Sequence, residues 1–244
     1  MLTGLSILQF FLCKATYISS CLFANDLFIA TVISVVDLPK YARVNLLKSD
    51  VSLVIAAFNE DGYLLCDERC GALEHNNFSI DPILPDVLKF HPLAPLTTHP
   101  LYRDSHIILQ DKASCLPAYL LAPPPGSNVV DCCAAPGNKT TQLASIMRNK
   151  GSITAFDKDR RRFAVLRKRV REAGATCVSP ILSDILKVRP EDYSSTEYIL
   201  VDPSCSGSGI LSRQDYSCVR KADVYVYVVL LAAPPYSYPG HVCT

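Results

Sequence analysis

A glycine-containing turn and one aspartate are the residues whose spacing best suits the binding of a small polar ligand. The turn is Ala134-Ala135-Pro136-Gly137, and a turn of this kind between a strand and a helix lets backbone N–H groups approach a ligand. Asp157 comes 20 residues after Gly137, where the next strand is predicted to end. An acidic side chain in that place can accept hydrogen bonds from a ribose diol. The spacing therefore predicts a nucleoside-bearing cofactor.

The composition of the turn argues against two common nucleotide cofactors. A dinucleotide-binding loop carries three glycines in the pattern GxGxxG, whereas the loop here has Gly137 and a rigid Pro136. A phosphate-binding P-loop has the pattern GxxxxGK[ST], and here Lys139 stands two positions after Gly137 without the first glycine of the pattern. The sequence therefore disfavours NAD and ATP.

Strands alternating with helices must position these residues. The apolar spacing predicts short strands over 128–131, 152–156, 178–182 and 198–201. It predicts helices over 141–148 and around Phe163, Leu166 and Val170. We expect an α/β fold with a parallel, doubly wound sheet, because strands that alternate with helices pair in parallel. After Arg213 the pattern is lost and at most one strand fits over 224–231, so the sheet is predicted to be incomplete at the C-terminus.

The composition is typical of a folded protein without a dominant charge. The chain has 244 residues, 49% of them hydrophobic, which is enough for one large domain or two small ones. With 24 basic and 23 acidic residues its net charge is +1, so a nucleic-acid partner must meet a local patch. Eleven cysteines are scattered along the chain, and we interpret them as mostly reduced thiols.

Neither a metal site nor a membrane span is predicted. Cys66 and Cys70 have the spacing of half a zinc site, but no second Cys/His pair completes the four ligands. The apolar opening at 1–36 lacks a preceding basic segment and is interrupted by Lys14 and Asp26, whereas a span needs ~20 apolar residues. We therefore expect no metal and no membrane partner.

Two long strings resemble motifs of the Nop/Sun family of RNA cytosine-C5 methyltransferases. DCCAAPGNKT at 131–140 is similar to the family's cofactor loop, and VDPSCSGSG at 201–209 is similar to its cysteine loop. Shorter matches lie at 39–45, 99–103 and 108–114. These strings are most similar to the branch, called member five in animals, that acts on large-subunit ribosomal RNA. The resemblance covers about residues 37 to 213.

The resemblance implies a Rossmann-like methyltransferase fold dependent on S-adenosylmethionine, with a small N-terminal α/β cap. It divides the chain into an unmatched apolar extension at 1–36, an RNA-binding-type cap at 37–116, the methyltransferase core at 117–213 and an unmatched tail at 214–244. The implied activity is methylation of a cytosine at C5 in large-subunit rRNA, in the nucleolus of the nucleus. Within the cap, residues 51–58 are expected to form a helix or a buried strand.

The resemblance also assigns cofactor contacts residue by residue. Around the methionine part of the cofactor it places Cys133, Ala134, Ala135, Pro136, Gly137, Asn138 and Lys139. Asp157 would hold the ribose with Arg162 nearby. Asp184 would contact the adenine side, and its alternative interpretation is a solvated loop carboxylate. Asp202 would face the methyl-transfer centre, which the general position of ligand sites at strand ends independently favours.

Methylation of cytosine at C5 needs a thiolate, because C5 becomes nucleophilic only after a thiolate has added to C6. By resemblance, Cys205 has the second of two cysteine roles and assists product release. The attacking cysteine of the family follows a threonine, and the only Thr-Cys pair here, Thr176-Cys177, stands before the third predicted strand rather than after the fourth. The main nucleophile is therefore not found. We expect the chain as written to bind the cofactor weakly without methylating RNA.

Three alternatives stay open. Cys205 itself could attack, as the cysteine of a comparable loop does in DNA cytosine-C5 methyltransferases. The chain could instead be a non-catalytic fragment that binds cofactor or RNA. It could also be a methyltransferase that acts on another substrate.

A basic run could meet the RNA. Residues 158–171 contain eight basic residues and one acid, and apolar residues at helical spacing turn these charges outward. Such a run is usually a solvated helix face, and a phosphate-binding stripe is the second interpretation. The resemblance suggests alternative RNA contacts at Arg43, Asn45, Tyr102 and Arg103.

Overall fold

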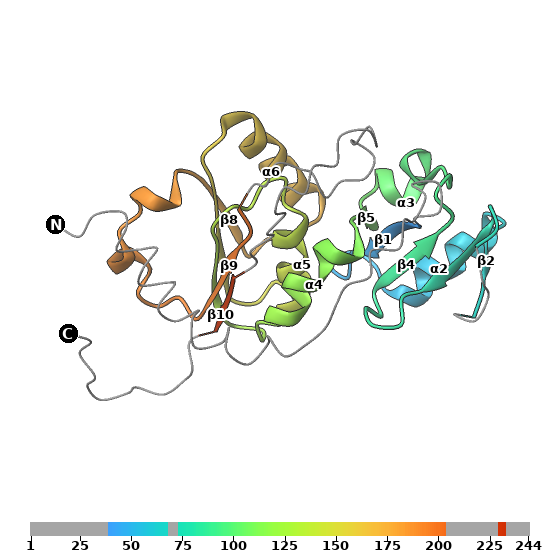
Figure 1. Cartoon of the computed structure of the whole chain (residues 1–244), viewed down its shortest axis with the longest axis horizontal. Coiled ribbons are helices and arrows are strands. Elements are labelled where there is room, and N and C mark those ends of the chain that lie inside the picture. Colours follow the sequence, from blue (N-terminus) through green and yellow to red (C-terminus); the bar gives the residue numbers. More distant parts are fainter. Residues whose placement is uncertain (1–38, 68–72, 204–228, 233–244) are drawn as a thin grey trace, which may run out of the picture.

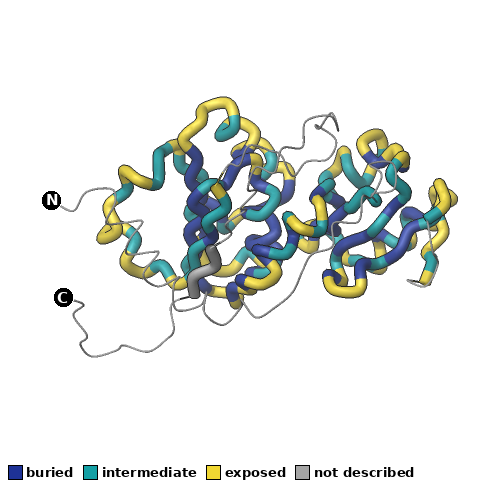
Figure 2. The backbone as a smooth tube through the Cα atoms, in the orientation of Figure 1, coloured by how far each residue is buried: buried dark blue, intermediate teal, exposed yellow. Residues whose placement is uncertain are grey.

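The computed structural model describes residues 39–67, 73–203 and 229–232, which form two β-sheet units side by side (Figure 1). Helices α4 (Lys112–Leu121) and α5 (Asn138–Ile146) lie between the two sheets. Buried residues follow both sheets and the helices between them (Figure 2). Each unit has a hydrophobic core of its own.

The N-terminal sheet is built from five strands and is mostly antiparallel. In sheet order the strands are β2 (Leu64–Leu65), β3 (Asn77–Ile80), β4 (Val87–Phe90), β1 (Lys40–Val44) and β5 (Ile107–Leu109). Only β2 and β3 pair in parallel within this sheet as described. The unit also contains helix α2 (Val51–Glu60), the 3-10 helix η2 (Leu96–Thr98) and the short helix α3 (Pro100–Arg103).

Residues 51–58, expected to form a helix or a buried strand, are helical. Asp50 caps the helix, because its carboxylate accepts a hydrogen bond from a backbone N–H of the first turn at 2.9 Å. Phe58 is fully buried and packs against Phe78 and Phe90, with ring centroids 5.5 and 4.9 Å away. The helix therefore presents its apolar side to the sheet, which gives this unit its core.

The C-terminal sheet has the strand order β10-β9-β6-β7-β8. Its strands are β6 (Asn128–Asp131), β7 (Ser152–Asp157), β8 (Val178–Leu182), β9 (Tyr198–Val201) and β10 (Val229–Ala232). Its helices are α5, α6 (Arg160–Glu172) and the 3-10 helices η3 (Ile185–Lys187) and η4 (Pro190–Tyr193). Strands β6 to β9 are parallel, which confirms the predicted α/β fold. β10 pairs antiparallel with β9, an orientation that the sequence pattern did not predict.

Helix α5 begins at Asn138 and ends at Ile146, whereas the sequence predicted a helix over 141–148. The start is earlier because Gly137 completes the turn in a left-handed conformation and the next residue is already helical. The end is earlier because Arg148 and Asn149 have φ values of +54° and +56°, which a right-handed helix does not accommodate. Both ends of helix α5 are thus set by backbone conformation.

Helix α4 joins the two units. It spans Lys112–Leu121 and so runs across residue 116, where the sequence analysis divided cap from core. Ala118 and Leu121 belong to the core of the C-terminal unit, while Cys115 packs with residues of the N-terminal unit. The helix therefore contributes to both units, and the division at 116 stays a prediction.

Candidate active site

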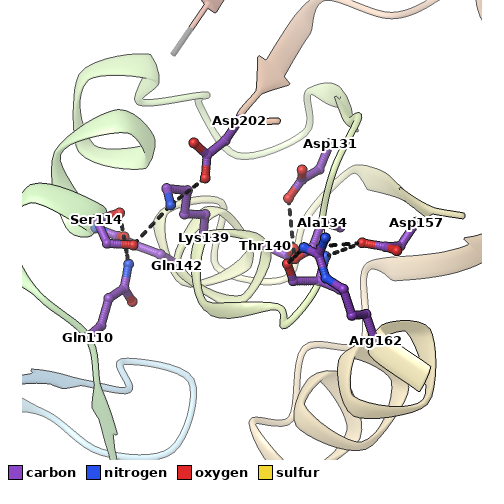
Figure 3. A network of polar contacts seen from close by, with 11 residues as sticks. Gln110, Ser114, Asp131, Ala134, Lys139, Thr140, Gln142, Asp157, Arg162 and Asp202 are labelled. Atoms are coloured by element: carbon purple, nitrogen blue, oxygen red, sulfur yellow. Dashed lines mark hydrogen bonds and ion pairs between the residues drawn. The ribbon is translucent and has the colours of Figure 1, made fainter. Parts of the chain in front are cut away.

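Three carboxylates gather at one edge of the C-terminal sheet (Figure 3). Asp131 ends β6, Asp157 ends β7, and Asp202 directly follows β9. The three strands are neighbours and run parallel, so their carboxyl ends share one edge. Open α/β sheets bind their ligands at this edge. The structure therefore brings together two aspartates that the sequence analysis placed in the site, Asp157 and Asp202, and adds Asp131.

The turn between β6 and α5 needs a glycine at position 137 for two reasons. Gly137 has a φ of +104°, which L side chains rarely adopt. A Cβ there would also stand 3.1 Å from Cδ1 of Leu166 in α6. The N–H of Gly137 donates to the carbonyl of Ala134 at 2.7 Å, which closes the turn. Glycine thus allows both the turn and the close approach of α6.

Asp157 ties the turn to the next strand and helix. One carboxylate oxygen accepts from the backbone N–H of Ala135 at 3.2 Å, and the other accepts from the N–H of Asp159 at 2.9 Å. Arg162 lies across this contact, with Nη2 3.6 Å from Asp157 Oδ2 and 2.5 Å from the carbonyl oxygen of Ala135. Asp157 is only 5% exposed, whereas the Arg162 side chain is 41% exposed. Asp157 is therefore shielded from solvent, while Arg162 beside it stays partly exposed.

Asp131 is buried beside the turn, and its role was missed by the sequence analysis. Its carboxylate accepts from Thr140 Oγ1 at 2.7 Å, and Thr140 is fully buried in the first turn of α5. Burial raises the pKa of Asp131 to about 6, although the hydrogen bonds from Thr140 and from the backbone of Cys133 and the charge of Lys139 act in the opposite direction. The signal in the sequence was a buried strand that ends in a carboxylate.

Asp202 forms an ion pair with Lys139 on the other side of α5 from Asp157 (Figure 3). Lys139 Nζ lies 2.6 Å from Asp202 Oδ2 and donates to Ser114 Oγ at 3.0 Å. The two side chains of the pair are 18% and 25% exposed. Ser114 belongs to α4 and ends the matched string at 108–114, but that string did not assign it a contact with the site. The predicted site residue Lys139 therefore faces Asp202 and the junction between the two units.

The remaining turn residues surround the start of α5. Ala134 and Ala135 are buried, Cys133 is half-buried and Pro136 is exposed. Asn138 is held through its side chain, because Oδ1 accepts a short hydrogen bond from Arg169 of α6. Burial raises the pKa of the Cys133 thiol to about 11. These residues lie beside the edge of the sheet that carries Asp131, Asp157 and Asp202, which we call the aspartate edge.

Asp184 lies next to the end of β7. The N–H of its neighbour Ser183 donates to the carbonyl of Asp157 at 3.1 Å. The Asp184 carboxylate caps η3 by accepting from the N–H of Leu186 at 3.1 Å and stands 4.0 Å from Lys158 Nζ. Asp184 is thus on the same edge of the sheet as the other aspartates. Its role as the cap of η3 is by itself a sufficient reason for a carboxylate at this position.

Cys177, which the sequence placed before the third strand and so outside the nucleophile position, lies far from the three aspartates. The carbonyl of Cys177 accepts from the N–H of Ile153 at 2.9 Å. Ile153 lies near the start of β7, so Cys177 is at the amino edge of the sheet, opposite the three aspartates. Burial raises the pKa of its thiol, which disfavours the thiolate. Cys205, predicted to assist product release, lies outside the described residues.

Two of the suggested RNA contacts are wrong. Arg43 and Asn45 are both 0% exposed, so neither side chain reaches the surface. Arg43 donates to Thr141 Oγ1 at 3.1 Å, and Asn45 Nδ2 donates to the carbonyl of Ala173 at 3.0 Å. Both side chains therefore hold the two units together. The motif alone predicted surface contacts because it does not show what packs over these two residues.

The predicted basic run forms α6 and the residues just before it. Leu166 and Val170 are buried under the helix, while Asp159 caps its start by accepting from two backbone N–H groups. The exposed basic residues of this run are Lys158, Arg160, Arg161, Arg167, Lys168 and Arg171. Their charges therefore lie on the outer face of the helix, as the spacing predicted.

The part of the chain that the structure describes contains neither a candidate metal site nor a helix that could span a membrane. No group of three or more His, Cys, Asp or Glu side chains in this part is arranged to hold a metal ion. No helix in it is both long and apolar enough to cross a membrane.

Two family models match most of the chain. The model described as "16S rRNA methyltransferase RsmB/F" matches residues 118–230. The model described as "NOL1/NOP2/Sun domain family member 5, ferredoxin-like domain" matches residues 38–110. The first match includes all three aspartates of the sheet edge, and the second covers the N-terminal sheet.

Similar proteins include ribosomal RNA methyltransferases from animals and fungi. The chain is 49% identical over 183 residues to the 28S rRNA (cytosine-C(5))-methyltransferase of Mus musculus, covering 72% of this chain and 39% of the relative. It is 39% identical over 193 residues to the 25S rRNA (cytosine-C(5))-methyltransferase rcm1 of Schizosaccharomyces pombe, covering 78% and 41%. The chain thus spans about two fifths of the length of these relatives.

The fold is also similar to a solved structure. A methyltransferase homologue from Pyrococcus horikoshii superposes with a TM-score of 0.59 at 31% sequence identity, covering 73% of this chain and 54% of that one. The similarity extends over most of the residues described here.

Proposed function

The chain belongs to the NSUN5-type family of rRNA cytosine-C5 methyltransferases, and from this premise we propose that it binds S-adenosylmethionine at the aspartate edge of the C-terminal sheet. We propose methylation at C5 of a cytosine in large-subunit rRNA as the reaction that this site serves in the family, since the mouse and fission yeast relatives are named for that reaction. The observation that carries the proposal is the arrangement of Asp131, Asp157 and Asp202 around the turn at Gly137.

The donor and acceptor groups at this edge fit an adenosyl cofactor. A carboxylate offers about four lone-pair positions, and Asp157 uses two of them for the backbone of Ala135 and Asp159. Arg162 approaches a carboxylate oxygen only to 3.6 Å, so a ribose diol can take its place there. Asp157 then holds the ribose, Asp184 lies on the adenine side, and residues 133–139 line the methionine part. The cofactor, when bound, supplies an electrophilic methyl group.

Lys139 and Asp202 suit the target base. Thiolate addition at C6 of cytosine places negative charge on the ring, and an ammonium group already in position stabilises such charge. Lys139 is held for this task by Asp202 at 2.6 Å and by Ser114 at 3.0 Å. We assign Asp202 to the methyl-transfer centre, with Lys139 as its partner.

The cysteine chemistry is divided between positions inside and outside the described residues. Cys205 is our candidate for product release. Cys133 and Cys177 are poor candidates for attack, because burial raises the pKa of both thiols and Cys177 lies at the far edge of the sheet. We propose that the chain as written binds the cofactor without completing the methylation.

The binding proposal is tested by photo-crosslinking. Radiolabelled S-adenosylmethionine is irradiated with the purified chain, and the labelled peptides are identified. We expect label on peptides that contain residues 132–139 or 157–162, and less label in Asp157→Ala than in the surface control Asp192→Ala. Label confined to peptides from the N-terminal sheet, or equal labelling of both variants, would overturn the proposed site.

The catalytic proposal has its own test. An rRNA fragment containing 5-fluorocytosine traps a cysteine that attacks C6 as a covalent adduct. We expect no adduct with this chain. An adduct that disappears in Cys205→Ala would make Cys205 the nucleophile, which is the second candidate mechanism.

For RNA, we propose that residues 37–116 act as the RNA-binding cap and that the outer face of α6 contacts phosphates. The support is the exposure of the basic residues on that face and the match of the N-terminal unit to the member-five ferredoxin-like domain. Because large-subunit rRNA is the proposed substrate, we propose the nucleolus as the site of action.

A further inference from the structure

Arg43 is a buried arginine at the junction of the two units. It lies on β1, is 0% exposed, and reaches three neutral oxygens. Nε donates to Gln110 Oε1 at 3.0 Å, while Nη2 donates to the carbonyl of Asn138 at 3.2 Å and to Thr141 Oγ1 at 3.1 Å. Nη1 is buried and has no hydrogen-bond partner among the described residues. This is a costly arrangement for a charged group.

The partners of Arg43 adjoin the proposed site. Asn138 stands between Gly137 of the turn and Lys139 of the ion pair. Its carbonyl is held by Arg43, and its side chain is held from the other direction by Arg169. The backbone from which Lys139 projects is therefore fixed on two sides.

A second branch leads to the other end of Lys139. Gln110, the partner of Arg43 Nε, donates to the carbonyl of Ser114 at 3.0 Å and to Gln142 Oε1 at 3.1 Å. The hydroxyl of Ser114 accepts from Lys139 Nζ at 3.0 Å. The contacts that start at Arg43 thus reach both the backbone and the ammonium group of Lys139.

We propose that Arg43 is a positioning residue, which uses the N-terminal sheet to fix Lys139 against Asp202. The inference rests on the proposed function of that pair and deepens it. The position of β1, and with it of the N-terminal unit, then sets the geometry at the side of the site that faces the base. Burial lowers the pKa of Arg43, because desolvation disfavours its charged form.

The chain offers a matched control for a loss of contact at the junction. Asn45 also bridges the units, since Nδ2 donates to the carbonyls of Ser105 and Ala173. None of these contacts involves Asn138 or Lys139. Asn45→Ala therefore weakens the junction without acting on the ion pair.

The test measures how fast Lys139 reacts with a small acylating reagent, read by mass spectrometry of the folded chain. In the wild type the ion pair and partial burial protect Lys139. We expect Arg43→Met to raise its labelling rate severalfold, and Arg43→Lys to do the same, because one ammonium group cannot bridge Gln110 and Asn138 together. Asn45→Ala should leave the rate near that of the wild type.

Equal rates in Arg43→Met, Asn45→Ala and the wild type would overturn the proposal, and so would full rescue by Arg43→Lys. If Arg43→Met does not fold, Thr141→Val removes one partner of Nη2 and should raise the rate less strongly. An unchanged rate in Thr141→Val would then count against the proposal. Labelling of Lys139 requires no cofactor. Absence of S-adenosylmethionine binding would therefore overturn the proposed function without changing the labelling rates, so the two proposals can fail independently.

Discussion

Lys139 and Asp202 hold their charged atoms 2.6 Å apart, where the first turn of α5 meets the end of β9. The lysine comes from the segment that resembles a cofactor loop, and the aspartate comes from the segment that resembles a cysteine loop. The ion pair therefore connects the two motifs on which the resemblance depends.

Loss of this pair should destabilise the fold. We expect Lys139→Met to lower the free energy of unfolding by about 1–3 kcal/mol, because it leaves Asp202 without its partner at a site that is mostly shielded from water. Urea denaturation measures this. Lys168→Met is the control, since Lys168 and Glu172 are 66% and 44% exposed, and it should cost less than about 0.5 kcal/mol. Equal costs would show that the pair at Asp202 contributes no more than a surface pair.

Gly137→Ala should be more harmful than Gly126→Ala. The two glycines have similar φ values of +104° and +102°, which a residue with a side chain adopts only under strain. For this reason each substitution should lower the free energy of unfolding by about 1–2 kcal/mol. A Cβ at position 137 also meets Leu166 at 3.1 Å, whereas nothing lies within 4 Å at position 126. We expect about 1 kcal/mol more loss at 137, measured by thermal or urea unfolding. A larger loss at 126 would contradict the packing that we describe.

Asp131 should make stability depend on pH. Burial raises its pKa from 3.8 to about 6 in the folded state, so the unfolded chain releases this proton more easily. The contribution of Asp131 to stability therefore falls as pH rises from about 4 to about 6, by roughly 2–3 kcal/mol in all. In Asp131→Asn, which keeps an oxygen to accept from Thr140, this part of the slope should vanish. Urea unfolding between pH 4 and 8 checks it, and identical slopes in the two proteins would refute it.

The elements of the C-terminal sheet were predictable because their signals are local. The buried run at 128–131 becomes β6 with the same limits, and Gly137 was identified from the turn that it makes possible. The position of Asp157 at a strand end follows from the length of one helix and one strand. These features depend on residues close together in the sequence.

The contacts that complete the site were not predictable in this way. Ser114 lies 25 residues before Lys139, and Arg43 lies 98 residues before Thr141. Only the packing of the N-terminal sheet against α5 brings these groups together, so a motif containing Arg43 was interpreted as a surface contact. The direction of β10 was missed for a similar reason, because a strand pattern is the same in either orientation.

The basic face of α6 should contribute to RNA affinity in a salt-dependent manner. Arg167 and Arg171 are exposed, and each phosphate contact that is lost should reduce the salt slope of binding by about 1. We expect the double variant Arg167→Ala/Arg171→Ala to bind an rRNA fragment more weakly and with a smaller slope in filter-binding assays. Arg189→Ala, at an exposed position paired with Asp192, is the control. Unchanged affinity and slope in the double variant would place RNA on another surface.

The central claim is that the aspartate edge binds an adenosyl cofactor, and isothermal titration calorimetry tests it most directly. We expect the folded chain to bind one S-adenosylmethionine and to bind neither NAD nor ATP measurably. Asp157→Ala should weaken binding at least tenfold, on the order of the ~1.5–3 kcal/mol that a hydrogen bond to a charged group contributes, while Asp192→Ala should bind like the wild type. Binding of NAD or ATP in place of S-adenosylmethionine, or unchanged affinity in Asp157→Ala, would contradict the account.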